Sequence, residues 1–266
     1  MPDVPFVRRK VTVSGRVIAY REEAEPRDQP PLVLIHGLGM SSKSFRTLLP
    51  HLADGFHVFA PDLPGAGASD KPEEPLSVDA LVTAVLGWMD AVHLREAAFV
   101  GHSLGGQIVT YLCQRNPERV SRAVLVAATP DPTVAPAWRK ALWLLADGLI
   151  EPPAFVALAT RDYLRANPHR MWGTLKKALR SDVDARARGV QVPTLVVRGS
   201  WDLVVREPWS RQLAETIPNG RYLSVPRGSH GLPAQAPAKL AAIIRDFLGA
   251  PALAESDAQP PNDAST

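Results

Sequence analysis

Residues 99–106 read FVGHSLGG, and the turn that they encode decides the fold. Three glycines fall within residues 101–106, directly after an apolar run. Glycine inside a helix or strand costs about 0.5–1 kcal/mol relative to alanine, so such a cluster indicates a backbone path that other residues follow poorly. Ser103 has a glycine two residues away on either side, the pattern G-x-S-x-G. A plain capped turn and a reactive serine both fit this pattern alone.

The sequence on either side of Ser103 favours the reactive serine. The apolar run 97–100 predicts a strand, and residues 107–116 have the spacing of a helix. A sharp strand-to-helix turn of this kind is the nucleophile elbow, which exposes the serine hydroxyl. It also places the serine at a helix N-terminus, where backbone N–H groups face a developing anion. We therefore interpret Ser103 as a nucleophile and the N–H of Leu104 as one oxyanion-hole donor.

The same alternation of short apolar runs and amphipathic segments continues along the chain. Two runs with a short connection come first, and runs then alternate with helical spacing, which predicts a mostly parallel sheet with an antiparallel start. The fold class is therefore α/β, an eight-stranded sheet with helices on both faces. The expected strands are 11–13, 17–20, 32–35, 57–60, 97–100, 123–127, 194–197 and 222–225, and the main expected helices are 78–92, 105–116, 208–217 and 236–248.

A serine hydroxyl is a weak nucleophile until a base takes its proton, so the interpretation requires a histidine and a carboxylate. His230 lies in PRGSHGLP, a loop directly after an expected strand and therefore on the same sheet edge as Ser103. Asp202 follows the preceding strand, which gives the chain order Ser, Asp, His that this architecture predicts. Asp131, after an earlier strand, is the competing carboxylate.

A second oxyanion donor is expected from the loop HGLGMSS after the strand 32–35. Glycines there let the backbone approach a ligand closely, and the N–H of Leu38 is the best candidate. His36 in this loop is expected to brace it, and His102 is expected to point away from the elbow. The candidates for a substrate pocket are Gly37, His102, Trp138, Trp143, Leu203 and Gly231.

Between residues 131 and 188 the alternation breaks down, and aromatic residues lie among helical patterns and prolines. We predict a helical cap over the sheet edge, in which Trp138, Trp143 and Leu144 either line an apolar pocket or pack as core. The remaining core is then 1–130 and 189–249. Residues 250–266 lack hydrophobic periodicity and are expected to form a disordered tail.

Bulk properties exclude several function classes. The net charge is only +3 and no Lys/Arg run exceeds Arg8–Lys10, which argues against nucleic-acid binding. One cysteine allows neither an intrachain disulfide nor a multi-cysteine metal site. The chain shows no signal-peptide pattern and no apolar stretch of about 20 residues. We expect a soluble, cytoplasmic monomer or homodimer with no metal and no organic cofactor.

Five stretches together resemble the α/β-hydrolase superfamily: LVLIHGLG, FAPDLPGAGASD, FVGHSLGG, TLVVRGSWDLVV and GSHGLP. The resemblance covers roughly residues 11–248. It implies that Asp62 and Ser69 of the second stretch are structural, with Ala66 in place of a frequent histidine. The resemblance is specific for the fold and the triad but not for the substrate. Our main hypothesis is a serine hydrolase that cleaves carboxylic esters of small or medium acyl groups through an acyl-enzyme.

The resemblance leaves other chemistries open. Epoxide hydrolases and haloalkane dehalogenases use an aspartate where this chain has Ser103, which argues against those branches. Serine haloperoxidase-like members share the elbow. A C–C bond hydrolase, thioesterase or acyltransferase would use the same triad, and a C–C hydrolase would use a cap arginine such as Arg161, Arg165 or Arg170 to steer a charged substrate. A receptor that binds a small ligand under the cap without catalysis is the alternative from another class.

Overall fold

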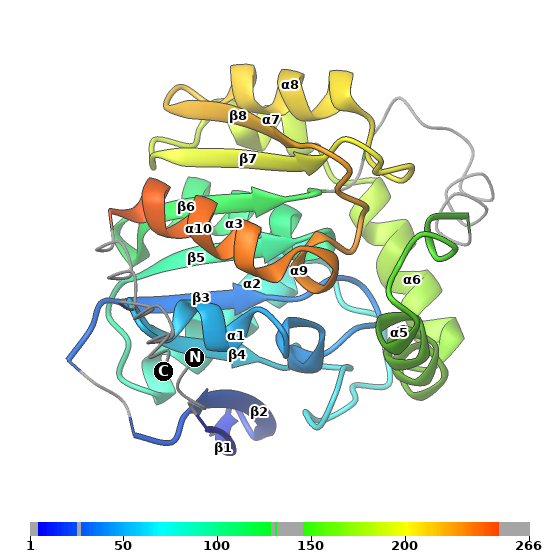
Figure 1. Cartoon of the computed structure of the whole chain (residues 1–266). Coiled ribbons are helices and arrows are strands. Elements are labelled where there is room, and N and C mark those ends of the chain that lie inside the picture. The colour runs from blue at the N-terminus through cyan, green and yellow to red at the C-terminus, as the bar shows by residue number, and fades with distance from the viewer. Residues whose placement is uncertain (1–4, 26–27, 129–130, 132–145, 250–266) are drawn as a thin grey trace, which may run out of the picture.

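The computed structural model describes residues 5–25, 28–128, 131 and 146–249, and its centre is one eight-stranded sheet (Figure 1). The strand order is β1-β2-β4-β3-β5-β6-β7-β8. β1 pairs with β2 and β2 with β4 in antiparallel fashion, and every other neighbouring pair is parallel. The predicted fold class is confirmed. The strands are β1 (Phe6–Val13), β2 (Arg16–Glu23), β3 (Pro31–Ile35), β4 (His57–Pro61), β5 (Ala97–His102), β6 (Val120–Val126), β7 (Thr194–Gly199) and β8 (Gly220–Val225).

The local sequence explains the turn of the first hairpin and the C-terminus of the last helix. Ser14 and Gly15 join β1 to β2 with φ values of 49° and 78°, the left-handed pair that a two-residue hairpin turn requires. The final helix, α10 (Pro237–Leu248), ends at Gly249 with φ 77°, a left-handed C-cap. Its apolar stripe follows helical spacing, and Leu240 and Ile244 on it are fully buried.

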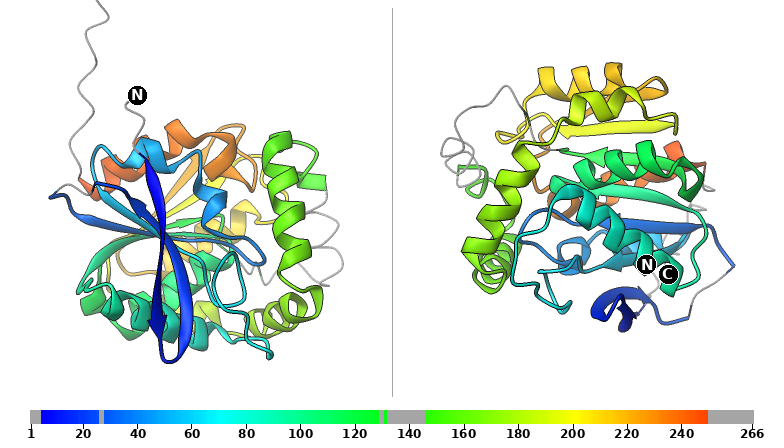
Figure 2. Two further views of the ribbon diagram at one scale, coloured as in Figure 1. Left: turned by 90° about the horizontal axis from the view of Figure 1, so that it is seen from below. Right: turned by 180° about the vertical axis from the view of Figure 1, so that it is seen from behind.

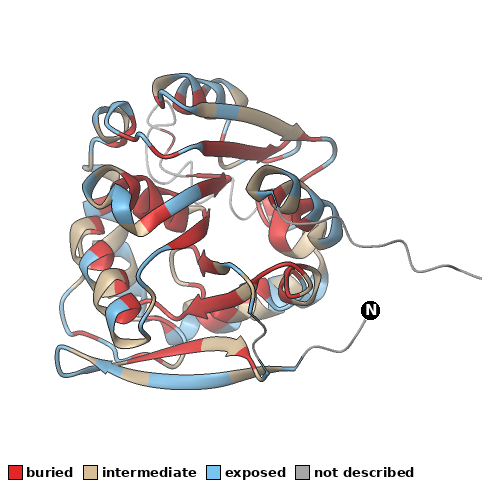
Figure 3. Ribbon diagram, turned by 90° about the vertical axis from the view of Figure 1, so that its left-hand side faces the viewer, coloured by how far each residue is buried: buried red, intermediate tan, exposed pale blue. Residues whose placement is uncertain are grey.

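Helices cover both faces of the sheet (Figures 1 and 2). One face carries α2 (Val78–Ala91), α3 (Leu104–Arg115) and α8 (Glu207–Thr216), which share one hydrophobic cluster with the strands. The other face carries α1 (Leu49–Leu52), α9 (Leu232–Gln235) and α10, which share a second cluster. Of the two short 3-10 turns, η1 (Ser42–Phe45) buries Phe45 in the second cluster, whereas η2 (Pro117–Arg119) has no buried residue. Because β5 lies between the two clusters, all six of its residues are buried. Figure 3 shows that the buried residues are concentrated in the middle of the molecule.

The insertion supplies α5 (Pro153–Arg165) and α6 (Pro168–Leu179), which lie beyond the carboxyl ends of the parallel strands (Figures 1 and 2). Ser41, after β3, donates its hydroxyl to the Asp162 carboxylate of α5 at 2.5 Å, so the two parts are joined by a buried hydrogen bond. A third helix, α7 (Val183–Arg188), packs against α3 and α8 of the core.

The division into core and cap stays a proposal, with α7 at its boundary. Trp138, Trp143 and Leu144 of the expected pocket, and the tail expected at 250–266, lie outside the described residues. None of the helices in the described ranges is both long enough and apolar enough to cross a membrane.

Candidate active site

Ser103 sits between β5 and α3 in a strained conformation. Its φ is 55° and its ψ is −119°, a region that costs a non-glycine residue about 1–3 kcal/mol. Two backbone hydrogen bonds hold it there: the Ser103 N–H donates to the Val126 carbonyl at 2.9 Å, and the Gly106 N–H donates to the Ser103 carbonyl at 2.9 Å. The turn therefore presents the hydroxyl above the carboxyl end of the sheet.

The glycines of the motif allow a close approach of three backbone segments. A Cβ at Gly101 would collide with the carbonyl oxygen of Gly105, and a Cβ at Gly105 would collide with the carbonyl oxygen of Ile35 in β3. Backbone cannot move aside as the end of a flexible side chain can. The glycines are thus required because α3 begins directly against β3 and β5.

Gly105→Ala is expected to lower the free energy of unfolding by about 3 kcal/mol through this overpacking. Gly15→Ala is the matched control, because no atom lies within 4 Å of a Cβ there. Its left-handed φ alone costs about 1 kcal/mol. Urea denaturation of both variants measures the difference. Equal destabilisation of the two variants would show that the elbow is not closely packed.

The structure brings together the three residues of the expected triad. His230 lies in the loop between β8 and α9, residues 226–231, which we call the base loop. Its Nε2 lies 3.2 Å from the Ser103 Oγ, and its Nδ1 lies 3.1 Å from the Asp202 Oδ2. With the proton on Nδ1, the imidazole donates to the carboxylate and accepts from the serine hydroxyl. This is the arrangement in which a histidine can take a serine proton.

Asp202 rather than Asp131 contacts the histidine. Asp202 is buried, and its Oδ1 accepts the N–H groups of Val204 and Val205, each at 2.8 Å. The second carboxylate oxygen is therefore left to face the imidazole. Asp131 is also buried, and its Oδ2 lies 3.3 Å from the N–H and 3.4 Å from the Nε of Arg206.

The surroundings of His230 favour its protonated form. Burial opposes protonation, but the charge of Asp202 and its hydrogen bond, followed by the charges of Asp147 and Glu151, raise the pKa of His230 above its usual value. A base with a raised pKa is a better proton acceptor, provided that the pH keeps it neutral in the free protein.

Two other histidines hold loops. Burial first, and then the nearby His230, lower the pKa of His102 to about 3, so it is neutral, and its Nε2 donates to the His230 carbonyl at 2.9 Å. His36 donates from Nδ1 to the Gly37 carbonyl at 2.8 Å and accepts the Leu63 N–H at Nε2 at 2.9 Å. His36 thus braces the loop after β3, as expected from the sequence.

The two candidate oxyanion donors lie on the loop and the helix that flank Ser103. Leu104 is the first residue of α3, so its N–H has no acceptor within the helix. Gly37, beside Leu38, runs so close to the elbow that a Cβ there would lie 3.1 Å from the Ser103 Cβ. Both leucines line the same pocket. Their assignment as donors stays a prediction.

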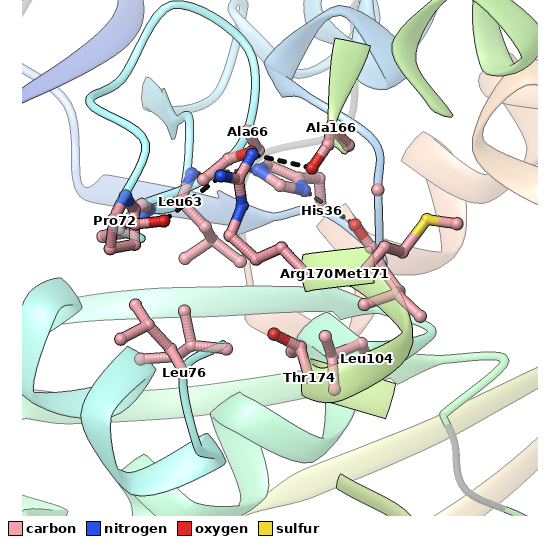
Figure 4. Close-up of a pocket in the computed structure, with 16 residues that line it drawn as sticks. His36, Leu63, Ala66, Pro72, Leu76, Leu104, Ala166, Arg170, Met171 and Thr174 are labelled. Carbon is pink, nitrogen blue, oxygen red and sulfur yellow. Dashed lines mark hydrogen bonds between the residues drawn. The ribbon is translucent and has the colours of Figure 1, made fainter. Parts of the chain in front are cut away.

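That pocket lies between the core and the cap (Figure 4). Its wall is largely apolar, with Leu63 and Leu76 from the core and Met171 from α6. Arg170 is the one acidic or basic side chain other than His36 among the described lining residues. Its guanidinium donates to three backbone carbonyl oxygens, those of Ala166 at 2.7 Å, Pro72 at 3.2 Å and Gly65 at 3.5 Å.

Of the expected pocket residues that the structure describes, some line the pocket and others make contacts elsewhere. Gly37 lines the pocket with Leu38 and Leu104. His102 binds the base loop, and the N–H groups of Leu203 and Gly231 donate to two carboxylates of the insertion. In the described ranges, no group of three His, Cys, Asp or Glu side chains has an arrangement that could hold a metal ion.

Those two carboxylates, Asp147 and Glu151, were missed by sequence reasoning. They are four residues apart in the insertion, a spacing that is typical of a solvated helix face. The structure instead buries both against the base loop. The one signal in the sequence is indirect: a loop of Gly, Ser and His needs acceptors for its N–H groups, and the sequence does not say which residues supply them.

The chain is similar to known hydrolases both in sequence and in structure. Residues 30–160 match the family model described as alpha/beta hydrolase fold. The chain is 30% identical to the "Putative carbamate hydrolase RutD" of Pseudomonas savastanoi pv. phaseolicola over 84% of this chain and 95% of that protein. It is 28% identical to a 2-hydroxymuconate semialdehyde hydrolase of Pseudomonas sp. over 86% and 88% of the two chains. The enol-lactonase of Burkholderia xenovorans has a similar structure, with a TM-score of 0.80, 25% identity and coverage of 91% and 100%.

Proposed function

The chain belongs to the α/β-hydrolase fold family, and from that premise we propose that it is a serine hydrolase that cleaves carboxylic esters of small or medium acyl groups. The observation that carries the proposal is the continuous chain of contacts from Ser103 Oγ through His230 to Asp202, at 3.2 and 3.1 Å. The strained backbone at position 103 holds the serine at the tip of the turn before any substrate binds, which is the preorganisation that acyl transfer needs.

In the proposed reaction, Ser103 Oγ attacks the carbonyl carbon of the ester while its proton passes to His230 Nε2. A C–O bond forms, and the carbonyl electron pair moves onto the oxygen, which the N–H groups of Leu104 and Leu38 stabilise. The C–O bond to the alcohol then breaks, and the alcohol leaves with the proton from His230. A water molecule, deprotonated by His230, hydrolyses the acyl-enzyme by the same two steps and releases the acid.

Two features support an ester substrate. The pocket beside Leu38 and Leu104 is mostly apolar, as an acyl chain or an uncharged alcohol would require. A lactone is a cyclic ester, and the enol-lactonase is similar to this chain over nearly its whole length. The expected partner is therefore a small molecule. The cytoplasmic location and the monomeric or homodimeric state expected from the sequence stay predictions.

A C–C bond hydrolase is the second candidate, and Arg170 is the observation that favours it. This guanidinium lines the pocket and contacts carbonyl oxygens rather than a carboxylate, so it could attract a negatively charged substrate. The 2-hydroxymuconate semialdehyde hydrolase is among the relatives. A carbamate would react by the same acyl transfer as an ester, in line with the name of the RutD relative.

A substrate panel separates these candidates. We expect p-nitrophenyl acetate and butyrate to be hydrolysed with a kcat/KM at least about 100-fold above that of a phenyl carbamate, an acyl thioester and an anionic vinylogous diketone. Each substrate is tested with the wild type and with Ser103→Ala, which reports the background. Turnover of the esters no faster than in the Ser103→Ala variant would contradict ester hydrolysis. Preference for the diketone would favour the C–C hydrolase instead.

A further inference from the structure

Asp147, in the insertion just before α5, reaches across to the base loop. Its carboxylate is buried, and it accepts the His230 N–H at 3.2 Å on Oδ2 and 3.4 Å on Oδ1. Its Oδ1 also accepts the N–H of Leu203 at 3.3 Å, the residue after Asp202. One side chain of the insertion thus binds the backbone beside two members of the proposed triad.

Glu151, four residues further on, binds the next residue of the same loop. Its Oε1 accepts the Gly231 N–H at 2.6 Å. Its Oε2 is buried against the Cα of Gly231, where a Cβ would collide with it, and has no hydrogen-bond partner among the described residues. The hydroxyl of Ser229 lies nearby and is also buried without a partner there.

Side chains from four parts of the chain therefore hold the base loop, and one of them is Ser200 after β7, whose hydroxyl accepts the Arg227 N–H at 2.8 Å. Gln235 of α9 accepts the Ser229 N–H at 3.0 Å, and His102 of β5 donates to the His230 carbonyl at 2.9 Å. The N–H groups of His230 and Gly231 donate to the insertion. Two of the six residues of the loop are glycines, which add little stiffness, so these contacts help to decide where the imidazole lies.

The use of two carboxylates here is costly and needs a reason. Burying a charge is unfavourable unless an opposite charge compensates it. Within the described ranges no lysine or arginine forms an ion pair with Asp147 or Glu151. A group that can become positive, His230, lies beside them: Asp147 binds its backbone, and both carboxylates act on its pKa. An amide side chain could accept the same N–H groups without the cost of a buried charge.

We propose that Asp147 and Glu151 are positioning residues for the reaction: both fix the base loop from the cap, and the negative charge of Asp147 stabilises the imidazolium that forms when Ser103 gives up its proton. This inference rests on the proposed function. It makes the position of the base dependent on the insertion, because Asp147 and Glu151 are the acceptors of two successive base-loop N–H groups.

The proposal gives a definite pH dependence. Burial, and then the nearby Asp147 carboxyl group, raise the pKa of Glu151 to about 7, whereas the nearby Ser229 hydroxyl and the Gly231 N–H oppose that rise. The charged or titratable groups around His230 are Asp202, Asp147, Glu151 and His102. Removal of a negative charge lowers the pKa of His230. Because only neutral His230 accepts the serine proton, the acid limb of the reaction should then move to lower pH.

The experiment measures the rate at which a fluorophosphonate labels Ser103 between pH 5 and 9, which requires no knowledge of the substrate. We compare the full-length wild type with Glu151→Gln, Asp147→Asn and Glu151→Ala. Asp147→Asn should move the acid limb down by about 0.5 pH unit or more, because it removes one nearby charge. Glu151→Gln should move it less, because the raised pKa of Glu151 leaves that side chain largely neutral on the acid limb. Glu151→Ala should also lower the maximal rate about 10-fold, since a small misplacement of a catalytic group is costly. Glu151→Gln should restore most of that maximal rate.

Asp184→Asn is the matched control. Its carboxylate is also in the insertion but binds Arg188, Gln212 and Thr216, so its labelling rate and acid limb should match the wild type. An unchanged acid limb in Asp147→Asn, together with a wild-type maximal rate in Glu151→Ala, would overturn the inference while leaving the proposed function intact. If Asp147→Asn does not fold, the maximal rate of Glu151→Ala decides. Absence of label in the wild type would instead overturn the proposed function.

Discussion

Replacing Ser103 with alanine is expected to lower kcat/KM for an ester by about 10⁵- to 10⁶-fold, because no other atom can form the acyl-enzyme. The residual rate should be that of binding and of oxyanion stabilisation alone. Substrate binding should change little, since the removed hydroxyl meets the substrate only as a nucleophile. The measurement is the steady-state rate with p-nitrophenyl butyrate, together with the dissociation constant of the alanine variant for the same ester.

A stability measurement and a control variant show whether this loss of activity comes from the missing nucleophile rather than from unfolding. Alanine at position 103 keeps the same strained backbone, so the free energy of unfolding should change by less than about 1 kcal/mol. Ser121→Ala, on an exposed position of β6, is the matched control and should keep wild-type activity. A Ser103→Ala variant that retains more than about one per cent of the activity would contradict the assignment of the nucleophile.

Asp202→Asn is expected to lower kcat about 10⁴-fold, the second-largest effect of a single change in this account. The amide donates where the carboxylate accepts, so it favours the histidine tautomer in which Nε2 carries the proton and cannot take another from Ser103. It also removes the largest attractive charge on His230, since Asp202 is the first of the groups that raise its pKa. The acid limb of the kcat/KM profile should therefore move to lower pH, while kcat/KM itself is much smaller at every pH.

Asp131→Asn is the natural control for that prediction. In the sequence, Asp131 is the alternative to Asp202 as the carboxylate of the triad. Its carboxylate lies beside Arg206 rather than His230. We expect less than a 10-fold loss in kcat and an unchanged acid limb. A larger loss of kcat in Asp131→Asn than in Asp202→Asn would mean that Asp131, and not Asp202, orients His230 in the working enzyme. The pH profile of kcat/KM, measured from pH 5 to 9, gives both answers.

Where the sequence succeeded, the signal was local. The elbow could be read from Ser103 and its flanking glycines because the turn is encoded within eight residues and both neighbours have clear periodicity. The loops that carry Asp202 and His230 each follow a strand directly, and parallel strands bring their carboxyl ends to one edge. The eight-stranded sheet follows from the same alternation, and the structure confirms it.

Where the sequence fell short, the cause was tertiary contact. The expected first strand covered 11–13, whereas β1 begins at Phe6, because pairing with β2 extends it through exposed charged residues that carry no apolar signal. The role of His102 depends on a carbonyl 128 residues away. Asp147 and Glu151 were overlooked for the same reason: their partners are N–H groups of a distant loop, and every non-proline residue has one.

The most direct test of the central claim is the labelling of the wild type with a fluorophosphonate, followed by peptide mapping. We predict one phosphonyl group per chain, on Ser103, and no label after His230→Ala, because the hydroxyl then lacks its base. Label on another residue, or no label on a folded wild type, would contradict the claim that Ser103 is an activated nucleophile. The second of these results would favour a non-catalytic protein that binds a small ligand beneath the cap.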